Sequence, residues 1–294
     1  MRLQAASGNA AVTGLIEGRR TLQRVALSSF NDGKPEHDPS RLSDAEIQGT
    51  DEYKALMAMN PVPIPQRDVT PAEAKLACQL LLRQMRQSPT PVATDKSALE
   101  QWLAKARVRS DVTGRAEATI GDQDWVAASP QDVNNPAQAD SEFTKWMLGG
   151  GTKPDAKTGK LNCWEMVLFS AFREGYLQEA QMRTMYTTAK TKMTTSGDVM
   201  EFPRTLERLM RSSNEQIYDP KDPQSPRPLR GDMVIFKEAA SHVALATGTR
   251  TGAGVEIISH WPPPDGDHHV KRTTIEALLT PLRLPTAKFW SPVW

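Results

Sequence analysis

The sequence predicts an α+β protein in which one amphipathic helix packs against an antiparallel sheet. Residues 161–175 carry apolar side chains at the three- and four-residue spacing of a helix with one buried face. Residues 242–247 and 255–260 are β-rich runs around a glycine-containing connection, which is typical of a hairpin. The short apolar run at 233–236 predicts a further buried strand before the hairpin.

Composition and charge exclude several classes of protein. The 294 residues include 36 basic and 35 acidic side chains, so the net charge of +1 gives no attraction to nucleic acid or to an anionic membrane. No phosphate-binding glycine loop is present, and no apolar run approaches the roughly 20 residues that span a bilayer. The N-terminal residues lack the apolar core of a secretory signal. We therefore expect cytoplasmic synthesis without a signal peptide, no membrane span, no cofactor and no nucleic-acid partner.

Shifts in composition divide the chain into three regions. Residues 1–60 mix glycine, asparagine, serine, aspartate and proline around a short helical stretch near 10–24, and we expect a mobile leader there. Residues 61–139 are expected to form a small helical region with its linker. Residues 140–294 are expected to form the main domain.

The middle region is predicted to begin with an extended linker and to continue as two helices. Three prolines within residues 60–66 prevent a helix and weaken any strand. Helices are predicted at 71–87 and 96–107, the second of them capped by Thr94 or Asp95.

Only two cysteines occur in the sequence. Cys78 takes an apolar position of the helix at 71–87, and we expect it to be a packed, unreactive thiol. Cys163 follows Asn162, a favoured N-cap residue, and Glu165 completes the spacing of a capping box. Cys163 is therefore expected to be the first residue of a buried helix.

The start of a helix favours reactivity in a thiol. Unpaired backbone N–H groups and the helix dipole stabilise negative charge there, so we expect Cys163 to have a lowered pKa and to act as a thiolate. The N–H groups of Cys163 and Trp164 could also hold the oxyanion that forms when an amide carbonyl is attacked. The alternative for this position is an unreactive cysteine that is merely packed at a helix start.

The predicted hairpin carries two histidines. With the turn centred on Thr251, His242 lies opposite His260, and the two side chains share one face with Cβ atoms about 5 Å apart. One imidazole could then orient the other. Ala244 and Ala246 leave space on this face, whereas a slip of one residue would move His260 to the other face.

A cysteine at a helix start, a histidine on a strand and a polar residue on the next strand form a set of nucleophile, base and orienting group. The segments that carry this set resemble the NlpC-type and CHAP-type papain-like amidases and endopeptidases over about residues 140–294. They are Asn162 to Glu165, Gly231 to Phe236, His242 to Ala246 and Ile258 to His260.

The resemblance implies a papain-like domain in which Cys163 is the nucleophile, His242 the general base and His260 the third polar residue that fixes the ring. No metal takes part in such a site. One departure is the long stretch between Cys163 and His242, which is predicted to hold helices near 178–192 and 204–211. This insert could cover the cleft and change the substrate.

The leader carries a second resemblance. Residues 3–12 and 19–24 are similar to the N-terminal segments of proteins associated with extracellular contractile injection systems, where such segments accompany cargo toxins. The resemblance implies export into a target cell as injection-system cargo. It also implies the injection-system tube or its loading components as partners.

Together these features predict an effector toxin-like hydrolase that cleaves amide bonds of peptidoglycan peptides or of a host protein through a thioester. Deamidation and acyl transfer use the same residue types and stay open. A non-enzymatic binding or structural cargo protein is the alternative from another class. Asp265 and Asp267 are reserve candidates for the orienting role, and His268 and His269 are expected in a solvated loop rather than at a metal.

Overall fold

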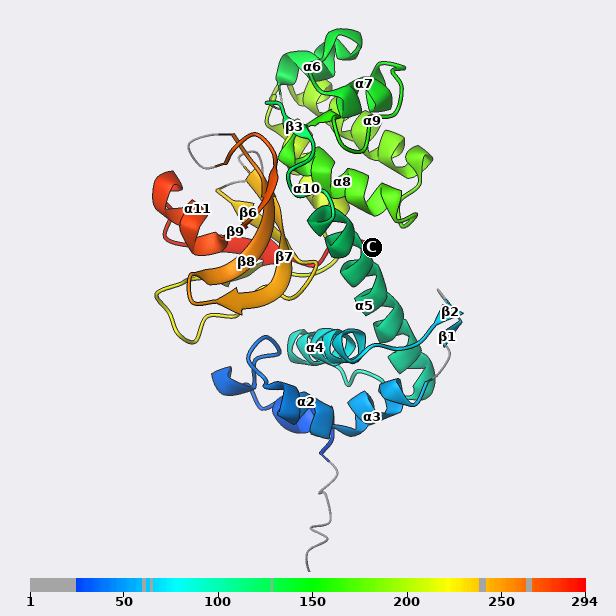
Figure 1. The fold of residues 1–294 in the computed structure, drawn as a ribbon, viewed down its shortest axis with the longest axis vertical. Helices are drawn as coiled ribbons and strands as arrows, with labels where there is room; N and C mark the ends of the chain where they lie inside the picture. Colours follow the sequence, from blue (N-terminus) through cyan, green and yellow to red (C-terminus); the bar gives the residue numbers. More distant parts are fainter. Residues whose placement is uncertain (1–24, 60–61, 64–65, 128, 238–241, 263–265) are drawn as a thin grey trace, which may run out of the picture.

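A computed structural model of the chain describes residues 25–59, 62–63, 66–127, 129–237, 242–262 and 266–294 (Figure 1). These residues contain ten α-helices and a six-stranded antiparallel sheet, so the predicted α+β class is confirmed. No helix in the described ranges is long and apolar enough to cross a membrane.

The sheet has the strand order β5-β10-β6-β7-β8-β9. Its two faces are both buried, because α8 (Cys163–Arg173) packs on one face and α11 (Ile275–Leu282) on the other. The predicted strand at 233–236 has the expected bounds. The strands are β5 (Gln216–Tyr218), β6 (Met233–Phe236), β7 (His242–Thr251), β8 (Gly254–His260), β9 (Val270–Thr274) and β10 (Ala287–Trp290).

Residues 25–59 are folded, so the mobile leader predicted for 1–60 is wrong over this range. Ser43 and Thr50 cap two short helices, and Ile47 and Leu56 are fully buried in a core separate from the core under α8. The helical stretch predicted near 10–24 lies outside the described residues. The elements are η1 (Leu27–Phe30), η2 (Pro35–His37), α2 (Asp44–Gly49) and α3 (Asp51–Met57), and beyond them β1 (Val62–Pro63) pairs with β2 (Gln66–Arg67) inside the predicted linker.

Two longer helices connect this N-terminal core to the sheet. Helix α4 (Pro71–Gln87) has the predicted bounds and buries Cys78, whose pKa burial raises to about 12. Helix α5 (Lys96–Glu117) begins after its predicted cap Asp95 but runs beyond the predicted end at 107. Its first half packs in the N-terminal core and its second half in the core under α8, so the helical region and the main domain share α5 (Figure 1).

A buried ion cluster fixes these helices to the start of β6. The carboxylate of Asp232 is fully buried. It forms an ion pair with the guanidinium of Arg83 of α4, with an N···O distance of 2.7 Å, and a second ion pair with Arg109 of α5. It also accepts the backbone N–H of Leu229 at 2.6 Å. Although burial raises the pKa of Asp232, the charges of Arg109 and Arg83 hold it below its usual value.

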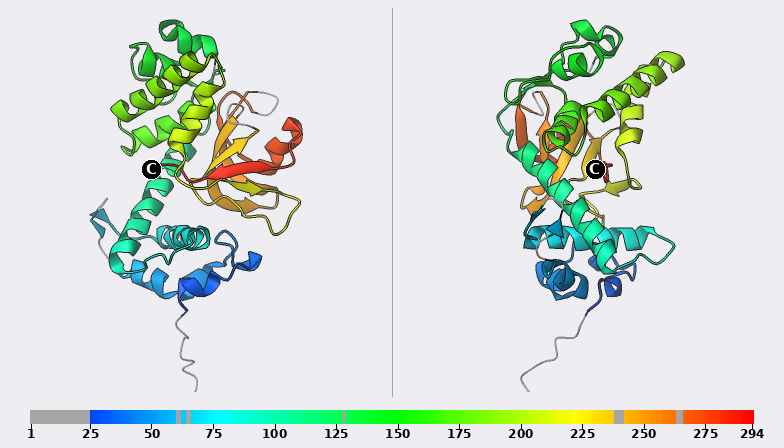
Figure 2. Two further views of the ribbon diagram at one scale, coloured as in Figure 1. Left: turned by 180° about the vertical axis from the view of Figure 1, so that it is seen from behind. Right: turned by 90° about the vertical axis from the view of Figure 1, so that its right-hand side faces the viewer.

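The remaining helices gather at the end of the molecule opposite the N-terminal helices (Figure 2). Both helices predicted between Cys163 and His242 are present, as α9 and α10. The elements of this end are β3 (Asp124–Trp125), α6 (Pro130–Asn134), η3 (Pro136–Gln138), α7 (Glu142–Leu148), β4 (Lys160–Leu161), α9 (Glu179–Ser196) and α10 (Glu201–Met210).

Candidate active site

Cys163 is the first residue of α8, as predicted. The Asn162 side chain accepts the Glu165 N–H at 3.1 Å, and the Glu165 carboxyl accepts the Asn162 N–H at 2.9 Å, so the predicted capping box is confirmed. The N–H groups of Cys163 and Trp164 are in the first turn and have no carbonyl partner within the helix. Neither N–H group is therefore bonded within the helix, and both lie against the Cys163 sulfur in this structure.

The sulfur of Cys163 is buried against the start of β7. The backbone N–H groups of Val243, Trp164 and Cys163 favour the thiolate, but burial outweighs them and raises the pKa of the thiol to about 12. The prediction of a lowered thiol pKa is therefore wrong for this structure, because desolvation dominates over the helix terminus. Val243 directly follows His242 in the chain, so the sulfur lies beside the strand position next to this histidine.

The His242 ring is enclosed by two aromatic side chains, with its centroid 4.1 Å from that of Trp261 and 5.6 Å from that of Phe236. Its Nε2 lies 2.9 Å from the hydroxyl oxygen of Ser259. Its Nδ1 is buried and has no hydrogen-bond partner in the described part of the chain. Burial and the charge of His260 lower the pKa of His242 to about 3, so the ring is neutral at pH 7.

The register of the hairpin differs by one residue from the predicted one. Ala244 pairs with Ser259 and Leu245 with Ile258, so the prediction that His242 lies opposite His260 is wrong. The reason is twofold. The turn lies between Thr251 and Gly254 instead of being centred on Thr251, and an irregularity in β7 between Ala246 and Arg250 then shifts the pairing by two residues. A sequence-based register counted from the turn cannot include such a bulge.

The slip places the two histidines on opposite faces of the sheet. His242 pairs with Phe236 and so shares the face under α11, where Ile275 and Leu278 fill the space that was predicted above Ala244. His260 pairs with Val270 and shares the face of α8 and Cys163.

The His260 ring is fully buried at the end of β8. Burial lowers the pKa of His260 to about 4, although the carbonyl groups of His268 and Asn162 favour its charged form. Its Nε2 lies 3.3 Å from the carbonyl oxygen of His268. His260 therefore supports the loop after β8 and the start of α8, on the face of the sheet opposite that of His242.

The three predicted catalytic residues thus lie near the start of β7 but on different faces of the sheet, with Cys163 and His260 on one face and His242 on the other. Among the described residues, no hydrogen bond or ion pair joins the Cys163 sulfur to either imidazole. Ser259 is the polar partner of His242 that the sequence analysis missed. Side chains alternate along β8, so Ser259 and His260 point to opposite faces. Once the register is known, this alternation places Ser259, and not His260, on the face of His242.

Only one of the two reserve candidates for the orienting role lies among the described residues. Asp265 lies outside the described residues, and Asp267 is exposed and accepts the N–H of His269 at 3.1 Å. The His269 ring lies against the carbonyl oxygen of Gln123 at 2.9 Å. The part of the chain that the structure describes contains no group of three or more His, Cys, Asp or Glu side chains that could hold a metal ion.

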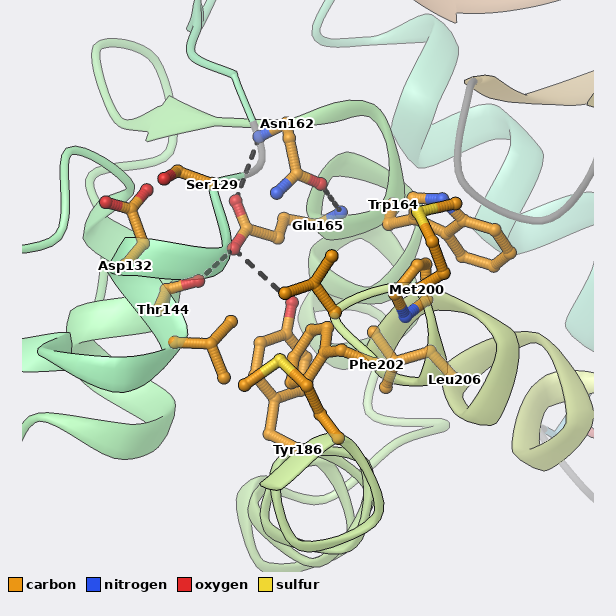
Figure 3. Close-up of a pocket in the computed structure, with 14 residues that line it drawn as sticks. Ser129, Asp132, Thr144, Asn162, Trp164, Glu165, Tyr186, Met200, Phe202 and Leu206 are labelled. Carbon is orange, nitrogen blue, oxygen red and sulfur yellow. Dashed lines mark hydrogen bonds between the residues drawn. The ribbon is translucent and has the colours of Figure 1, made fainter. Parts of the chain in front are cut away.

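A pocket of about 190 Å³ opens beside the start of α8 (Figure 3). It is lined by Asn162 and Trp164, the two chain neighbours of Cys163. The buried Glu165 carboxyl lies in its wall and accepts hydrogen bonds from the hydroxyl groups of Thr144 at 2.7 Å and Tyr186 at 3.3 Å. Burial raises the pKa of Glu165, whereas these donors oppose the rise.

Comparison with models of protein families, with characterised proteins and with solved structures finds no match for the chain. The case for a function therefore depends on the geometry of this site.

Proposed function

We propose that the chain is a papain-like cysteine hydrolase that cleaves amide bonds, with Cys163 as the nucleophile and His242 as the general base. One observation carries this proposal: the Cys163 sulfur, at the start of α8, lies against the N–H of the residue that follows His242. A thiol at a helix start beside a strand histidine is the arrangement that nucleophilic cysteine catalysis needs.

In this proposal Ser259 takes the orienting role that the sequence analysis gave to His260. When Nε2–H of His242 donates to the Ser259 hydroxyl at 2.9 Å, the neutral ring carries its lone pair on Nδ1. This Nδ1 is the buried nitrogen without a described partner. His242 is the first residue of β7, and its ring contacts Trp261, which packs against the core under α8. In the proposal, Nδ1 accepts the proton of the thiol around this end of the sheet. Ser259 is therefore a positioning residue and His242 the group that moves the proton.

The resting site holds a neutral thiol and a neutral imidazole, because burial raises the pKa of Cys163 and lowers that of His242. The sulfur attacks the carbonyl carbon as its proton passes to His242, and the N–H groups of Cys163 and Trp164 hold the oxyanion. His242 then protonates the departing amine, which leaves a thioester. Water, activated by His242, hydrolyses the thioester and restores the thiol.

Deamidation of a glutamine side chain and acyl transfer share the first half of this sequence. They differ in what leaves, ammonia or an amine, and in what attacks the thioester, water or a second nucleophile. The substrate of the proposed hydrolase is a protein of a target cell or a peptidoglycan peptide. The proposed role of residues 1–24 is loading of the protein as injection-system cargo.

The test uses the full chain in a Cys78→Ala background, so that Cys163 is the only thiol. The protein and its Cys163→Ala and His242→Asn variants are incubated with purified peptidoglycan and with cell lysate, and mass spectrometry identifies new peptide ends, lost ammonia or added acyl groups. We expect products with the parent protein and none with either variant. The same products from Cys163→Ala would contradict the proposal and favour a non-enzymatic cargo protein.

A further inference from the structure

The pocket beside α8 has an apolar end and a polar end. Figure 3 shows Ser129 and Asp132 on one side, Trp164 on the other and the Glu165 carboxyl between them. The apolar end comes from the end of α9, from α10 and from the turn between them. Its side chains are Met193, Val199, Met200, Phe202, Pro203 and Leu206.

Two polar atoms in the wall of this pocket are buried without a hydrogen-bond partner among the described residues. They are Nε1 of Trp164, whose side chain is 5% exposed, and Oδ2 of Asp132. Buried polar atoms in native proteins are nearly always bonded, so such atoms point to a missing partner. The indole N–H needs an acceptor and the carboxylate oxygen needs a donor, and one peptide unit supplies both.

The size of the pocket limits what it can hold. At about 190 Å³ it is smaller than the roughly 300–1,000 Å³ of sites for whole drug-sized ligands. It has room for one bulky side chain and the backbone attached to it. Its apolar lining favours a leucine, methionine or phenylalanine over the small and charged residues of peptidoglycan stem peptides.

We propose that this pocket binds a bulky apolar residue of a protein substrate next to the amide bond that Cys163 attacks. Trp164 donates its Nε1–H to the carbonyl oxygen of that residue, and Asp132 accepts the N–H of the same peptide unit. The adjacency to Cys163 rests on the proposed function, because Asn162 and Trp164 line the pocket on either side of the nucleophile in the sequence. The helices between Cys163 and His242 would then select a protein over peptidoglycan.

Binding can be tested without turnover in the full-length Cys163→Ala protein. The indole N–H signal of Trp164, assigned through its loss in Trp164→Phe, is followed by NMR during titration with N-acetyl-leucine amide and with N-acetyl-alanine amide. We expect a saturable shift with the leucine compound, with an affinity roughly tenfold or more above that for the alanine compound. An unmoved signal, or equal affinity for both compounds, would overturn the inference.

The matched variants are Val199→Asp and Val293→Asp. Both valines are 46% exposed, but Val199 lines the pocket, whereas Val293 lies at the far end of α10, where its N–H bonds to Met210. Val199→Asp is expected to abolish the shift, and Val293→Asp to leave it unchanged. A shift that survives Val199→Asp would place the ligand elsewhere and overturn the inference.

A peptide library separates this inference from the proposed function. Cleavage that requires Cys163 but shows no preference for an apolar residue would overturn the pocket assignment and leave the hydrolase. Binding of the leucine compound by a protein that cleaves nothing would leave the pocket as a peptide-binding site and remove the hydrolase. Cleavage with at least a tenfold preference for leucine, methionine or phenylalanine supports both.

Discussion

The hydroxyl oxygen of Ser259 lies 2.9 Å from Nε2 of His242, across the two strands of the hairpin. The contact exists because Ser259 pairs with Ala244, which places it on the same face as His242 and two positions along the strand. Both side chains are buried, so the hydrogen bond has no competing water. The register of the sheet, rather than the identity of the second histidine, decides which residue orients the ring.

Replacement of Ser259 by alanine is expected to lower kcat/KM roughly 5- to 30-fold with little change in KM. The loss corresponds to about 1–2 kcal/mol, within the cost of about 1–3 kcal/mol for a buried polar group that is left without its partner. It arises because His242 would present its acceptor nitrogen to the thiol less often. The measurement is steady-state kinetics over a range of pH, since a positioning role changes the pH profile, whereas a purely structural role does not.

Ser259→Thr is the matched control, because it keeps the hydroxyl and should restore most of the activity. His260→Gln provides the opposite comparison. An unchanged Ser259→Ala protein together with an inactive His260→Gln protein would show that the sequence-based assignment of His260 was right and that Ser259 has no part in catalysis.

Acid is expected to destabilise the fold through the two buried histidines. Burial lowers the pKa of His242 to about 3 and of His260 to about 4, below the value of about 6.5 in an unfolded chain. The unfolded state therefore binds more protons below pH 6.5, so their stabilisation is present above this pH and is lost as the pH falls toward 4. Each histidine should lower the free energy of unfolding by up to about 1.4 kcal/mol per pH unit.

Urea denaturation at pH 7, 6 and 5 measures this slope. His242→Gln and His260→Gln should each flatten it, and the double variant should flatten it most. A slope that is unaffected by both substitutions would mean that other groups cause the acid sensitivity and that the two rings titrate normally.

The parts of the fold that depend on local chemistry could be predicted from the sequence. The bounds of α4, the cap of α5 and the capping box at Asn162 follow from residues within a few positions of one another. The site could be predicted only in part. Its register depends on a bulge in β7, and the pKa of Cys163 depends on packing by residues distant in the sequence.

The folded segment before residue 60 was missed for a related reason. Its helices are short and its composition is polar, but Ile47 and Leu56 are buried against α4 and its neighbours. The stabilisation comes from tertiary contacts that no short window of sequence contains.

Asp232→Asn is expected to destabilise the protein by about 3–5 kcal/mol. The substitution leaves Arg83 and Arg109 buried with their charges uncompensated, which costs far more than the loss of an exposed pair. Asp198→Asn is the control, because its pair with Arg204 is exposed and should contribute little to stability. Equal urea midpoints for the two variants would show that the buried cluster does not hold α4 and α5 to the sheet.

Glu165→Gln is expected to loosen the helices around the proposed substrate pocket. The Glu165 carboxyl accepts hydrogen bonds from Ser141 on the loop before α7, from Thr144 on α7 and from Tyr186 on α9. An amide has one acceptor oxygen and a donor NH2 group, so at least one buried donor loses its partner at a cost of about 1–3 kcal/mol. Hydrogen exchange should then quicken in α7 and α9 but not in α4. Glu174→Gln, in a partly exposed pair with Arg115, is the control, and equal exchange in the two variants would rule out the carboxyl as the link.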